Sequence, residues 1–475
     1  MTGDTIVRTP SGAVRGVVEG GVRRWSGVPF AHVPDRFRRA VPAQWGGVFD
    51  ATQWGPAPWQ PLPAFDDPAA PFAEDCLNVV VWAPAEMTGP LPVLVWIYGG
   101  GFEQGSNASP LSRGDALAAA GDMIVVAVNY RIGALGWAEL AHLGGPFAEA
   151  SNLGLRDIVA GLQWVQSHIA DFGGDPQRVT VMGESAGSFA ACALLGVPHA
   201  VTLFSSLAAF SGCASRIVPM DQARGLGEDI LSALDGDPMS ASPEAWLDAQ
   251  RRATPRDIGA RNSARPRTLG VVDDSAVEHG LLTRHPLQAA REGIWAGKRL
   301  LVGTTRDEAT FFPQPDDLTA DALRADVVEW TNDPRAAAVV DAYLADGDPL
   351  ADTRRRIITD WVYRLPTARL ARAVADSGGS AHLSMVGRVD GRPAPHGVDV
   401  PGLFGRTLPT SDAGERARDA QITDAIRRFV RDEMSWTPLE PGASRARAAT
   451  FGDASFDAGA AYDDVTARWH TIERP

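Results

Sequence analysis

The chain has 475 residues, of which 45% are hydrophobic and 21% are charged, so it can bury a large core. Its formal net charge of −14 at pH 7 argues against nucleic acid and anionic membrane surfaces as partners. No stretch approaches about 18 uninterrupted apolar residues, and the first residues lack a basic and apolar leader, so we expect no membrane span.

The cysteines are too few and too scattered for a disulfide framework or a zinc site; they are Cys76, Cys192 and Cys213. We therefore expect no metal ion and a reducing, cytoplasmic location. The sequence carries no pattern that sets an oligomeric state.

The N-terminal part of the chain predicts antiparallel strands. Residues 6–9 and 13–18 are β-branched segments on either side of Pro10-Ser11-Gly12, which is typical of a hairpin, and residues 22–30 predict a third strand. Residues 37–73 are rich in Pro and Trp and show little periodicity. They predict an ordered surface loop, because tryptophans need burial.

Apolar runs of strand length recur along the rest of the chain and alternate with helical patterns. The runs cover residues 77–82, 93–98, 123–129, 179–182, 299–303 and 383–386, and the helical patterns cover residues 115–120, 155–169 and 420–431. This alternation predicts an α/β fold with a central, mostly parallel sheet flanked by helices. No composition shift marks a boundary, so we expect one domain over residues 1–475, with a largely helical excursion at about 215–380.

A sharp turn is predicted where the strand over residues 179–182 ends. Gly183-Glu184-Ser185-Ala186-Gly187 matches the G-x-S-x-G pattern of a nucleophile elbow, and a helix of small residues follows it. Such a turn strains the serine backbone and projects the hydroxyl from the turn, beside the N–H groups that open the helix. A glycine-rich turn without catalytic function is the alternative, because composition alone produces such matches.

A serine nucleophile also needs donors for the oxyanion that forms. Gly99-Gly100-Gly101 follows the strand over residues 93–98 and offers backbone N–H groups without side chains in the way. A phosphate-binding glycine loop is disfavoured, because no Lys-Ser/Thr pair follows and the G-x-G-x-x-G spacing is absent.

The nucleophile further requires a base and an acid that orients the base, in the chain order Ser, Asp or Glu, His. The histidines after Ser185 are His199, His279, His285, His382, His396 and His470. His396 is the best placed, because it follows the strand that ends at residue 386. For the acid, spacing leaves both Asp307 and Glu308 open, since both follow the strand over residues 299–303.

Motifs across nearly the whole chain, in matching order, resemble the type-B carboxylesterases of the α/β-hydrolase fold, the family of bacterial para-nitrobenzyl esterases and cholinesterases. The motifs are Ser11-Gly12-Ala13-Val14-Arg15-Gly16, Glu74-Asp75-Cys76-Leu77-Asn78, Trp96-Ile97-Tyr98-Gly99-Gly100-Gly101-Phe102, Asn129-Tyr130-Arg131 and Phe172-Gly173-Gly174-Asp175-Pro176, followed by the elbow. The resemblance implies an α/β-hydrolase domain without a metal or organic cofactor.

The resemblance also implies roles for single residues. Ser185 is similar to the family's nucleophile, His396 to its base and Glu308, rather than Asp307, to its acid. The family's oxyanion donors correspond to Gly100, Gly101 and Ala186, and Ser211 resembles a serine near the triad. We expect the substrate-binding residues to be Phe102, Glu184, Ser211, Phe311 and Phe312.

Two departures from the family pattern bear on the site. The cysteine that often pairs with the position of Cys76 is missing, so Cys76 is expected to be a free buried thiol. The loop over residues 59–74 is short and offers only Trp59, Phe65 and Phe72 as aromatic side chains.

These observations predict a serine carboxylic-ester hydrolase that acts through an acyl-enzyme on small, neutral, largely apolar esters. One alternative is an acyltransferase or a lactone-forming or lactone-cleaving enzyme of specialised metabolism with the same triad. The other is a non-catalytic adhesion-type relative, which is disfavoured because such relatives lack the serine.

Overall fold

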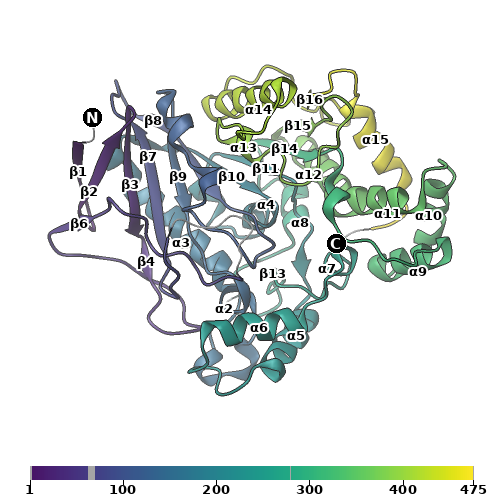
Figure 1. The fold of residues 1–475 in the computed structure, drawn as a ribbon, viewed down its shortest axis with the longest axis horizontal. Helices are drawn as coiled ribbons and strands as arrows, with labels where there is room; N and C mark the ends of the chain where they lie inside the picture. Colours follow the sequence, from purple (N-terminus) through teal and green to yellow (C-terminus); the bar gives the residue numbers. More distant parts are fainter. Residues whose placement is uncertain (1–2, 62–69, 279, 474–475) are drawn as a thin grey trace.

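The computed structural model describes residues 3–61, 70–278 and 280–473, and a 12-stranded sheet runs through the molecule. Its strand order is β1-β2-β3-β7-β9-β8-β10-β11-β14-β15-β16, and β6 pairs with β2 at one edge. The strands from β1 to β9 pair antiparallel along this order, and those from β9 to β16 pair parallel. Figure 1 shows β1–β3 at one end of the molecule and α9–α11 at the opposite end.

The strands of this sheet are β1 (Gly3–Thr9), β2 (Gly12–Glu19), β3 (Val22–Pro29), β6 (Val48–Asp50), β7 (Asn78–Pro84), β8 (Leu91–Ile97), β9 (Ile124–Val128), β10 (Gly174–Glu184), β11 (Ser206–Phe210), β14 (Arg299–Thr305), β15 (Ser380–Val386) and β16 (Ala448–Phe451). Two short pairs lie outside it, namely β4 (Ala31–His32) with β5 (Val41–Pro42), and β12 (Ile217–Val218) with β13 (Val271–Val272).

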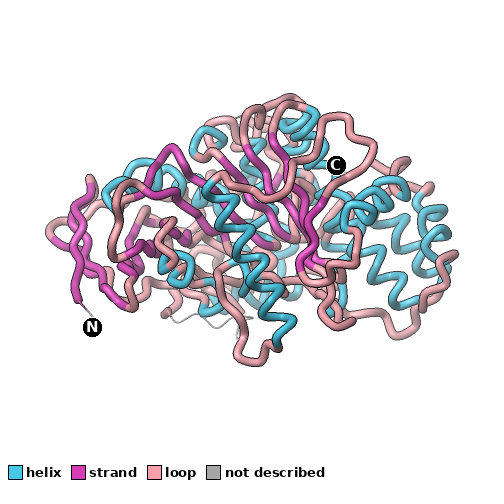
Figure 2. The backbone as a smooth tube through the Cα atoms, turned by 90° about the horizontal axis from the view of Figure 1, so that it is seen from above, coloured by secondary structure: helices cyan, strands magenta, loops and turns pink. Residues whose placement is uncertain are grey.

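The helices are α1 (Asp115–Ala119), α2 (Gly133–Trp137), α3 (Leu153–His168), α4 (Ala186–Ala193), α5 (Met220–Ala233), α6 (Pro243–Ala253), α7 (Ile258–Arg261), α8 (Pro286–Arg291), α9 (Ala320–Thr331), α10 (Ala336–Leu344), α11 (Leu350–Ile358), α12 (Leu365–Asp376), α13 (Val400–Leu403), α14 (Ala413–Arg431) and α15 (Ala458–Arg468). Seen from above, the strands run through the middle of the molecule, and a group of helices lies at the end opposite to the N-terminus (Figure 2).

The predicted α/β architecture with a mostly parallel sheet is confirmed. The predicted hairpin is β1 with β2, and every apolar run that predicts a strand lies on one. The central strands β7, β8 and β9 are buried almost along their whole length, which explains why they are apolar at every position instead of alternating.

Three parts of the chain differ from their sequence patterns. The segment Ser206–Phe210 consists mostly of small residues, and its pattern does not predict a strand. It nevertheless forms β11, which pairs with both β10 and β14. The strand β10 begins at Gly174, five residues before the apolar run over residues 179–182 that predicts it. The helix α14 begins at Ala413, seven residues before the predicted start, where Asp412 and Glu415 form a capping box.

The loop over residues 37–73 is described except for residues 62–69, so Phe65 lies outside the described residues. The side chains of Cys76, Cys192 and Cys213 are buried and form no disulfide. Helices predominate between residues 215 and 380, although β14 returns there to the central sheet. No helix within the described ranges is long and apolar enough to cross a membrane.

Candidate active site

Ser185 lies at the turn between β10 and α4, with a backbone conformation of φ 53° and ψ −124°. This conformation is strained for a serine, and the surrounding packing must hold it. A Cβ on Gly187 would lie 2.0 Å from the carbonyl oxygen of Ile97, so only glycine lets α4 approach β8 this closely. The turn therefore fixes the serine hydroxyl at the carboxyl end of the parallel strands.

Two hydrogen bonds link Ser185 to a histidine and the histidine to a carboxylate. Nε2 of His396 is 2.8 Å from Oγ of Ser185, and Nδ1 of His396 is 2.7 Å from Oε2 of Glu308. His396 lies in the loop after β15, and Glu308 lies three residues after β14. In this arrangement the imidazole can take a proton from the serine while the carboxylate stabilises the imidazolium.

The carboxylate of Glu308 is fully buried and held by two donors at its other oxygen. Oε1 accepts hydrogen bonds from Oγ of Ser211 at 2.7 Å and from the backbone N–H of Thr305 at 2.8 Å. These bonds leave Oε2 directed at the imidazole, so the carboxylate can orient the ring.

Asp307, the other carboxylate that the sequence leaves open, lies elsewhere. Its two oxygens accept hydrogen bonds from Arg388 at 2.9 and 2.7 Å, and Oδ2 also accepts one from the backbone N–H of Ala394. Burial alone would raise the pKa of Asp307, but Arg388 and the Ala394 N–H outweigh it and lower that pKa. The structure thus places Glu308, and not Asp307, next to His396.

The glycine loop follows β8 and lies beside the elbow, because Ile97 at the end of β8 pairs with Gly183. Gly100 and Gly101 have φ angles of 108° and 68°. Ala186 opens α4, so its N–H has no acceptor within the helix. These backbone N–H groups belong to the two segments that meet at Ser185, the glycine loop and the first turn of α4.

The substitution Gly101→Val tests the loop. A Cβ on Gly101 meets no atom within 4 Å, so the substitution changes the loop without a clash of that atom. We expect kcat to fall by about 10²–10³-fold, as after loss of an oxyanion donor. The matched control is Gly297→Val, because Gly297 has φ +74° and a Cβ there would also meet no atom within 4 Å. Gly297 precedes β14, at the end of that strand opposite to Glu308. Equal kcat in the two variants would contradict the role of the loop.

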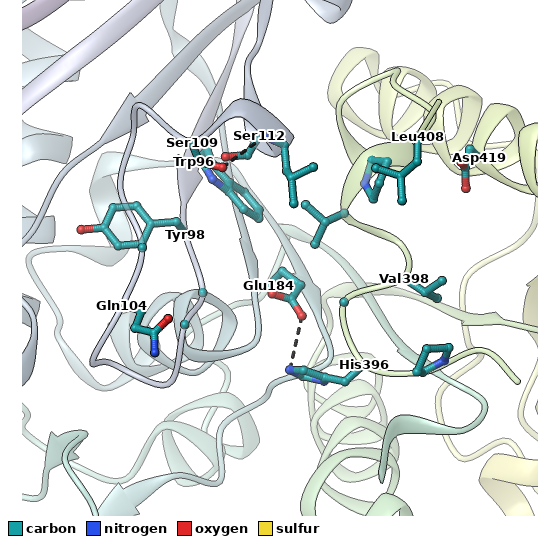
Figure 3. A pocket seen from close by; sticks show the side chains of 18 of the residues that line it. Trp96, Tyr98, Gln104, Ser109, Ser112, Glu184, His396, Val398, Leu408 and Asp419 are labelled. Carbon is teal, nitrogen blue, oxygen red and sulfur yellow. Dashed lines mark hydrogen bonds and ion pairs between the residues drawn. The ribbon is translucent and has the colours of Figure 1, made fainter. Parts of the chain in front are cut away.

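A cavity of about 390 Å³ opens at Glu184 and His396, between β8 and the segment that carries α13 and α14. Its lining includes Glu184 and His396 at one end and apolar side chains along the walls; these are Trp96, Leu111, Phe311, Val398, Val400, Pro401 and Leu408. Figure 3 shows Glu184 and His396 facing each other in this cavity. A cavity of this size is suited to a small organic group.

The expected substrate-binding residues separate into two groups. Glu184 and Phe311 line the cavity, where Phe311 is 75% exposed at its mouth, and the ring of Phe312 lies 6.0 Å from that of His396. Phe102 and Ser211 are not among the residues that line it, and both are fully buried.

Phe102 and Ser211 have structural contacts in place of the expected substrate contacts. The ring of Phe102 is covered by Trp137, with ring centroids 4.5 Å apart, and by the guanidinium of Arg216. The hydroxyl of Ser211 is occupied by Glu308. Phe102 has a positive φ of 69°, and its ring lies in the core, which the sequence did not indicate.

Burial and negative charge control the protonation of the site. Burial raises the pKa of Glu184 to about 8. Burial alone would lower the pKa of His396, but the carboxylates of Glu184 and Glu308 outweigh it and raise that pKa to about 9. Oε1 of Glu184 lies 3.5 Å from Nε2 of His396, so Glu184 stabilises the protonated imidazole.

The substitution Glu184→Gln is expected to shift the pH dependence of kcat/KM. The base works only when His396 is neutral, so activity is lost as the pH falls through its pKa. Removing the Glu184 carboxylate lowers that pKa, and the acidic limb should move by about 1 unit or more to lower pH. The control Glu433→Gln removes an exposed carboxylate and should leave the limb in place. A limb that stays fixed or moves to higher pH in Glu184→Gln would refute this coupling.

Tyr363 and Asp399 also lie near His396, although no motif in the sequence points to them. The ring of Tyr363 lies 5.1 Å from that of His396, on a π-helical segment, Thr359–Arg364, between α11 and α12. Asp399 is buried next to α13, and burial, followed by the charge of Glu308, raises its pKa to about 6. The spacing of three residues between His396 and Asp399 was the only available signal, and by itself it is too common to be informative.

Within residues 3–61, 70–278 and 280–473, no group of three or more His, Cys, Asp or Glu side chains is placed to hold a metal ion. The chemistry described above needs only side chains and backbone N–H groups of the chain.

Comparison with known proteins gives consistent matches over most of the chain. Residues 3–433 match the model of the carboxylesterase family. The chain is 34% identical to the para-nitrobenzyl esterase of Bacillus subtilis over 447 residues, which is 89% of this chain and 87% of that protein. It is 32% identical to the phenmedipham hydrolase of Pseudarthrobacter oxydans over 388 residues, which is 77% of this chain and 75% of that protein.

Solved structures show the same architecture. The carboxylesterase of Geobacillus stearothermophilus superposes with a TM-score of 0.85 at 30% identity, covering 98% of this chain and all of that one. A para-nitrobenzyl esterase superposes with a TM-score of 0.81 at 29% identity, covering 94% of this chain and 96% of that one. The central sheet with its flanking helices is therefore that of the α/β-hydrolase fold.

Proposed function

Because this chain belongs to the carboxylesterase family and is a carboxylic-ester hydrolase, we propose that Ser185, His396 and Glu308 catalyse the hydrolysis through an acyl-enzyme. The observation that carries the proposal is the chain of hydrogen bonds from Ser185 through His396 to the buried Glu308. Hydrolysis is favoured over acyl transfer, because the relatives named above are esterases and hydrolases. A non-catalytic role is disfavoured, because the three side chains are present and aligned.

The reaction follows from the positions of these atoms. His396 Nε2 takes the proton of the Ser185 hydroxyl as Oγ attacks the ester carbonyl, and the N–H groups of Gly100, Gly101 and Ala186 stabilise the oxyanion. The imidazolium then gives its proton to the departing alcohol. Water, deprotonated by His396, attacks the acyl-enzyme, and the proton returns to Ser185 as the acid leaves.

A series of p-nitrophenyl esters graded by acyl length tests this function. We expect the chain to hydrolyse them and an organophosphate to label Ser185 in step with the loss of activity. Ser185→Ala should show neither hydrolysis nor labelling. Activity that survives labelling of Ser185, or a label on another serine, would contradict the proposal.

We further propose that the substrates are neutral and largely apolar. Support comes from the apolar walls of the cavity and from the position of Trp59. The ring of Trp59 packs on that of Phe72 at 5.6 Å, in a small separate pocket that Arg36 and Arg131 also line. Trp59 therefore offers no aromatic face to a cation at Ser185.

Butyrylcholine and its uncharged isostere, 3,3-dimethylbutyl butyrate, test the preference for neutral esters. We expect kcat/KM for the cation to exceed that for the isostere by less than about tenfold at high salt, where long-range attraction to the acidic chain is screened. A larger advantage for butyrylcholine would reveal a cation site and contradict this assignment.

We also propose a cytoplasmic location and a single domain over the whole chain. The unpaired buried cysteines support the location, because disulfides persist mainly in oxidising compartments. The continuous sheet order from β1 to β16 supports the single domain.

A further inference from the structure

Three side chains that line the catalytic cavity carry a buried polar atom without a hydrogen-bond partner. These atoms are Nε1 of Trp96, Oγ of Ser112 and Oε1 of Glu184, and their residues are 2%, 3% and 6% exposed. Oε1 of Glu184 has the ion-pair contact of 3.5 Å with Nε2 of His396 described above. Buried polar groups in proteins nearly always have partners, because an unpaired one is costly. Because Glu184 already contacts His396, the atoms that a bound ligand would satisfy are those of Trp96 and Ser112, which indicate that the cavity receives a ligand with a polar group.

The three atoms lie at two ends of the cavity. Glu184 lies beside His396, where the reaction takes place. Trp96 pairs with Met182, three residues before Ser185, which places it roughly 10 Å further along the strands. Figure 3 shows Trp96, Ser109 and Ser112 grouped together and apart from His396.

The walls between the two ends are apolar. Leu111, Val398, Val400 and Leu408 line the cavity, and the indole of Trp96 packs on Phe404 with ring centroids 4.9 Å apart. A group that spans the cavity therefore needs an apolar body with polar atoms only at its ends.

The position of His396 identifies which part of an ester enters this cavity. His396 must protonate the departing alcohol oxygen, so the alcohol lies beside the imidazole, and the cavity is lined by His396 and the residues that follow it. This step rests on the proposed function. With the alcohol placed in this way, Glu184 lies next to the ester oxygen, and Trp96 and Ser112 lie next to the far end of the alcohol.

The chemistry of the far end selects a hydroxyl group. The indole N–H of Trp96 only donates, whereas the Ser112 hydroxyl donates or accepts. A hydroxyl accepts from Trp96 and donates to Ser112 at once, but an ammonium group cannot accept. A carboxylate would lie in a cavity that Glu184, Glu415 and Asp419 also line, where the only arginine, Arg418, is already paired with Asp419.

We propose that the leaving-group cavity recognises alcohols with an apolar chain and a terminal hydroxyl, so that the preferred substrates are monoesters of long-chain diols or similar hydroxy-alcohols. Trp96 and Ser112 are then specificity-determining residues at the far end of the site.

The test compares acetate esters of n-alkanols with monoacetates of the matching terminal diols, from four to ten carbons. For each length we take the ratio of kcat/KM for the hydroxyl-terminated ester to that for the methyl-terminated ester. At short lengths the hydroxyl lies against apolar walls, and the ratio should be below one. At the length that reaches Trp96 and Ser112 the ratio should rise by about fivefold or more, as one or two hydrogen bonds allow.

Two variants assign the rise to its cause. Trp96→Phe keeps an aromatic ring but removes the indole N–H, and Ser112→Ala removes the hydroxyl; each should lower the ratio at the matching length by about threefold or more. Trp436→Phe and Ser167→Ala are the controls, because Trp436 also has an unpartnered indole N–H and Ser167 is exposed on α3. Both controls should keep the wild-type ratios.

A measurement on the wild-type chain alone covers the case in which a variant does not fold. Terminal diols should inhibit competitively with a Ki at least about threefold below that of the matching n-alkanols, at the same length at which the ratio rises. A ratio that is flat with length, or a rise that survives both variants, would overturn the inference. Absence of hydrolysis for every ester would instead refute the proposed function, and the inference with it.

Discussion

Replacing Ser185 or His396 with alanine is expected to lower kcat by about 10⁴-fold or more, and the double variant should lose little beyond either single variant. The 2.8 Å hydrogen bond between the two side chains makes them one proton-transfer unit, so removing either partner already removes the step. Rates are to be measured on a p-nitrophenyl ester under saturating substrate.

The controls for this experiment are Ser167→Ala and His470→Ala, which change the same residue types at exposed positions. Both should retain the wild-type kcat. Losses that multiply in the double variant would show that Ser185 and His396 contribute independently, contrary to the proposed mechanism.

Replacing Glu308 with glutamine is expected to lower kcat by about 10³-fold, less than the loss in Ser185→Ala. Glutamine keeps the size of the side chain but removes the charge that stabilises the His396 imidazolium, and its amide can present an N–H to Nδ1. The residue is fully buried and held by Ser211 and Thr305, so the geometry should be retained.

Asp307→Asn is the matched variant, because Asp307 precedes Glu308 in sequence but is bonded to Arg388. It should leave kcat within about threefold of wild type and lower Tm by a few degrees, since it weakens a partly exposed ion pair. Thermal unfolding and kcat are to be measured on both variants. A crippling Asp307→Asn together with a mild Glu308→Gln would reverse the choice of acid.

The division between local and long-range information explains where sequence patterns succeed in this chain. Buried strands such as β7, β8 and β9 can be recognised in the sequence, because burial on both faces demands an apolar residue at every position. The elbow at Ser185 is also local, since the close approach of α4 and β8 requires glycine at Gly187. The strand β11 could not be recognised from its sequence, because its small residues satisfy a helix pattern as well as a strand pattern.

The sequence by itself determined the α/β class, the turn that holds Ser185 and the glycine loop beside it, because each depends on residues close together in the chain. Spacing left Asp307 and Glu308 open and the family resemblance selected Glu308, but the contacts that distinguish the two carboxylates belong to the tertiary structure. Arg388 binds Asp307, while Ser211, which is 97 residues away from Glu308 in sequence, fixes that carboxylate towards His396.

The contents of the cavity are likewise a property of the tertiary structure. The sequence placed Phe102 at the substrate, yet its backbone turns the ring into the core, and Trp96 and Ser112 line the cavity instead. Which side chains face a cavity depends on how β8, α13 and α14 pack, and this packing joins residues more than 300 positions apart. The spacing of residues in the sequence does not reveal such contacts. The chemistry of the site can therefore be deduced from local motifs, whereas its specificity requires the folded structure.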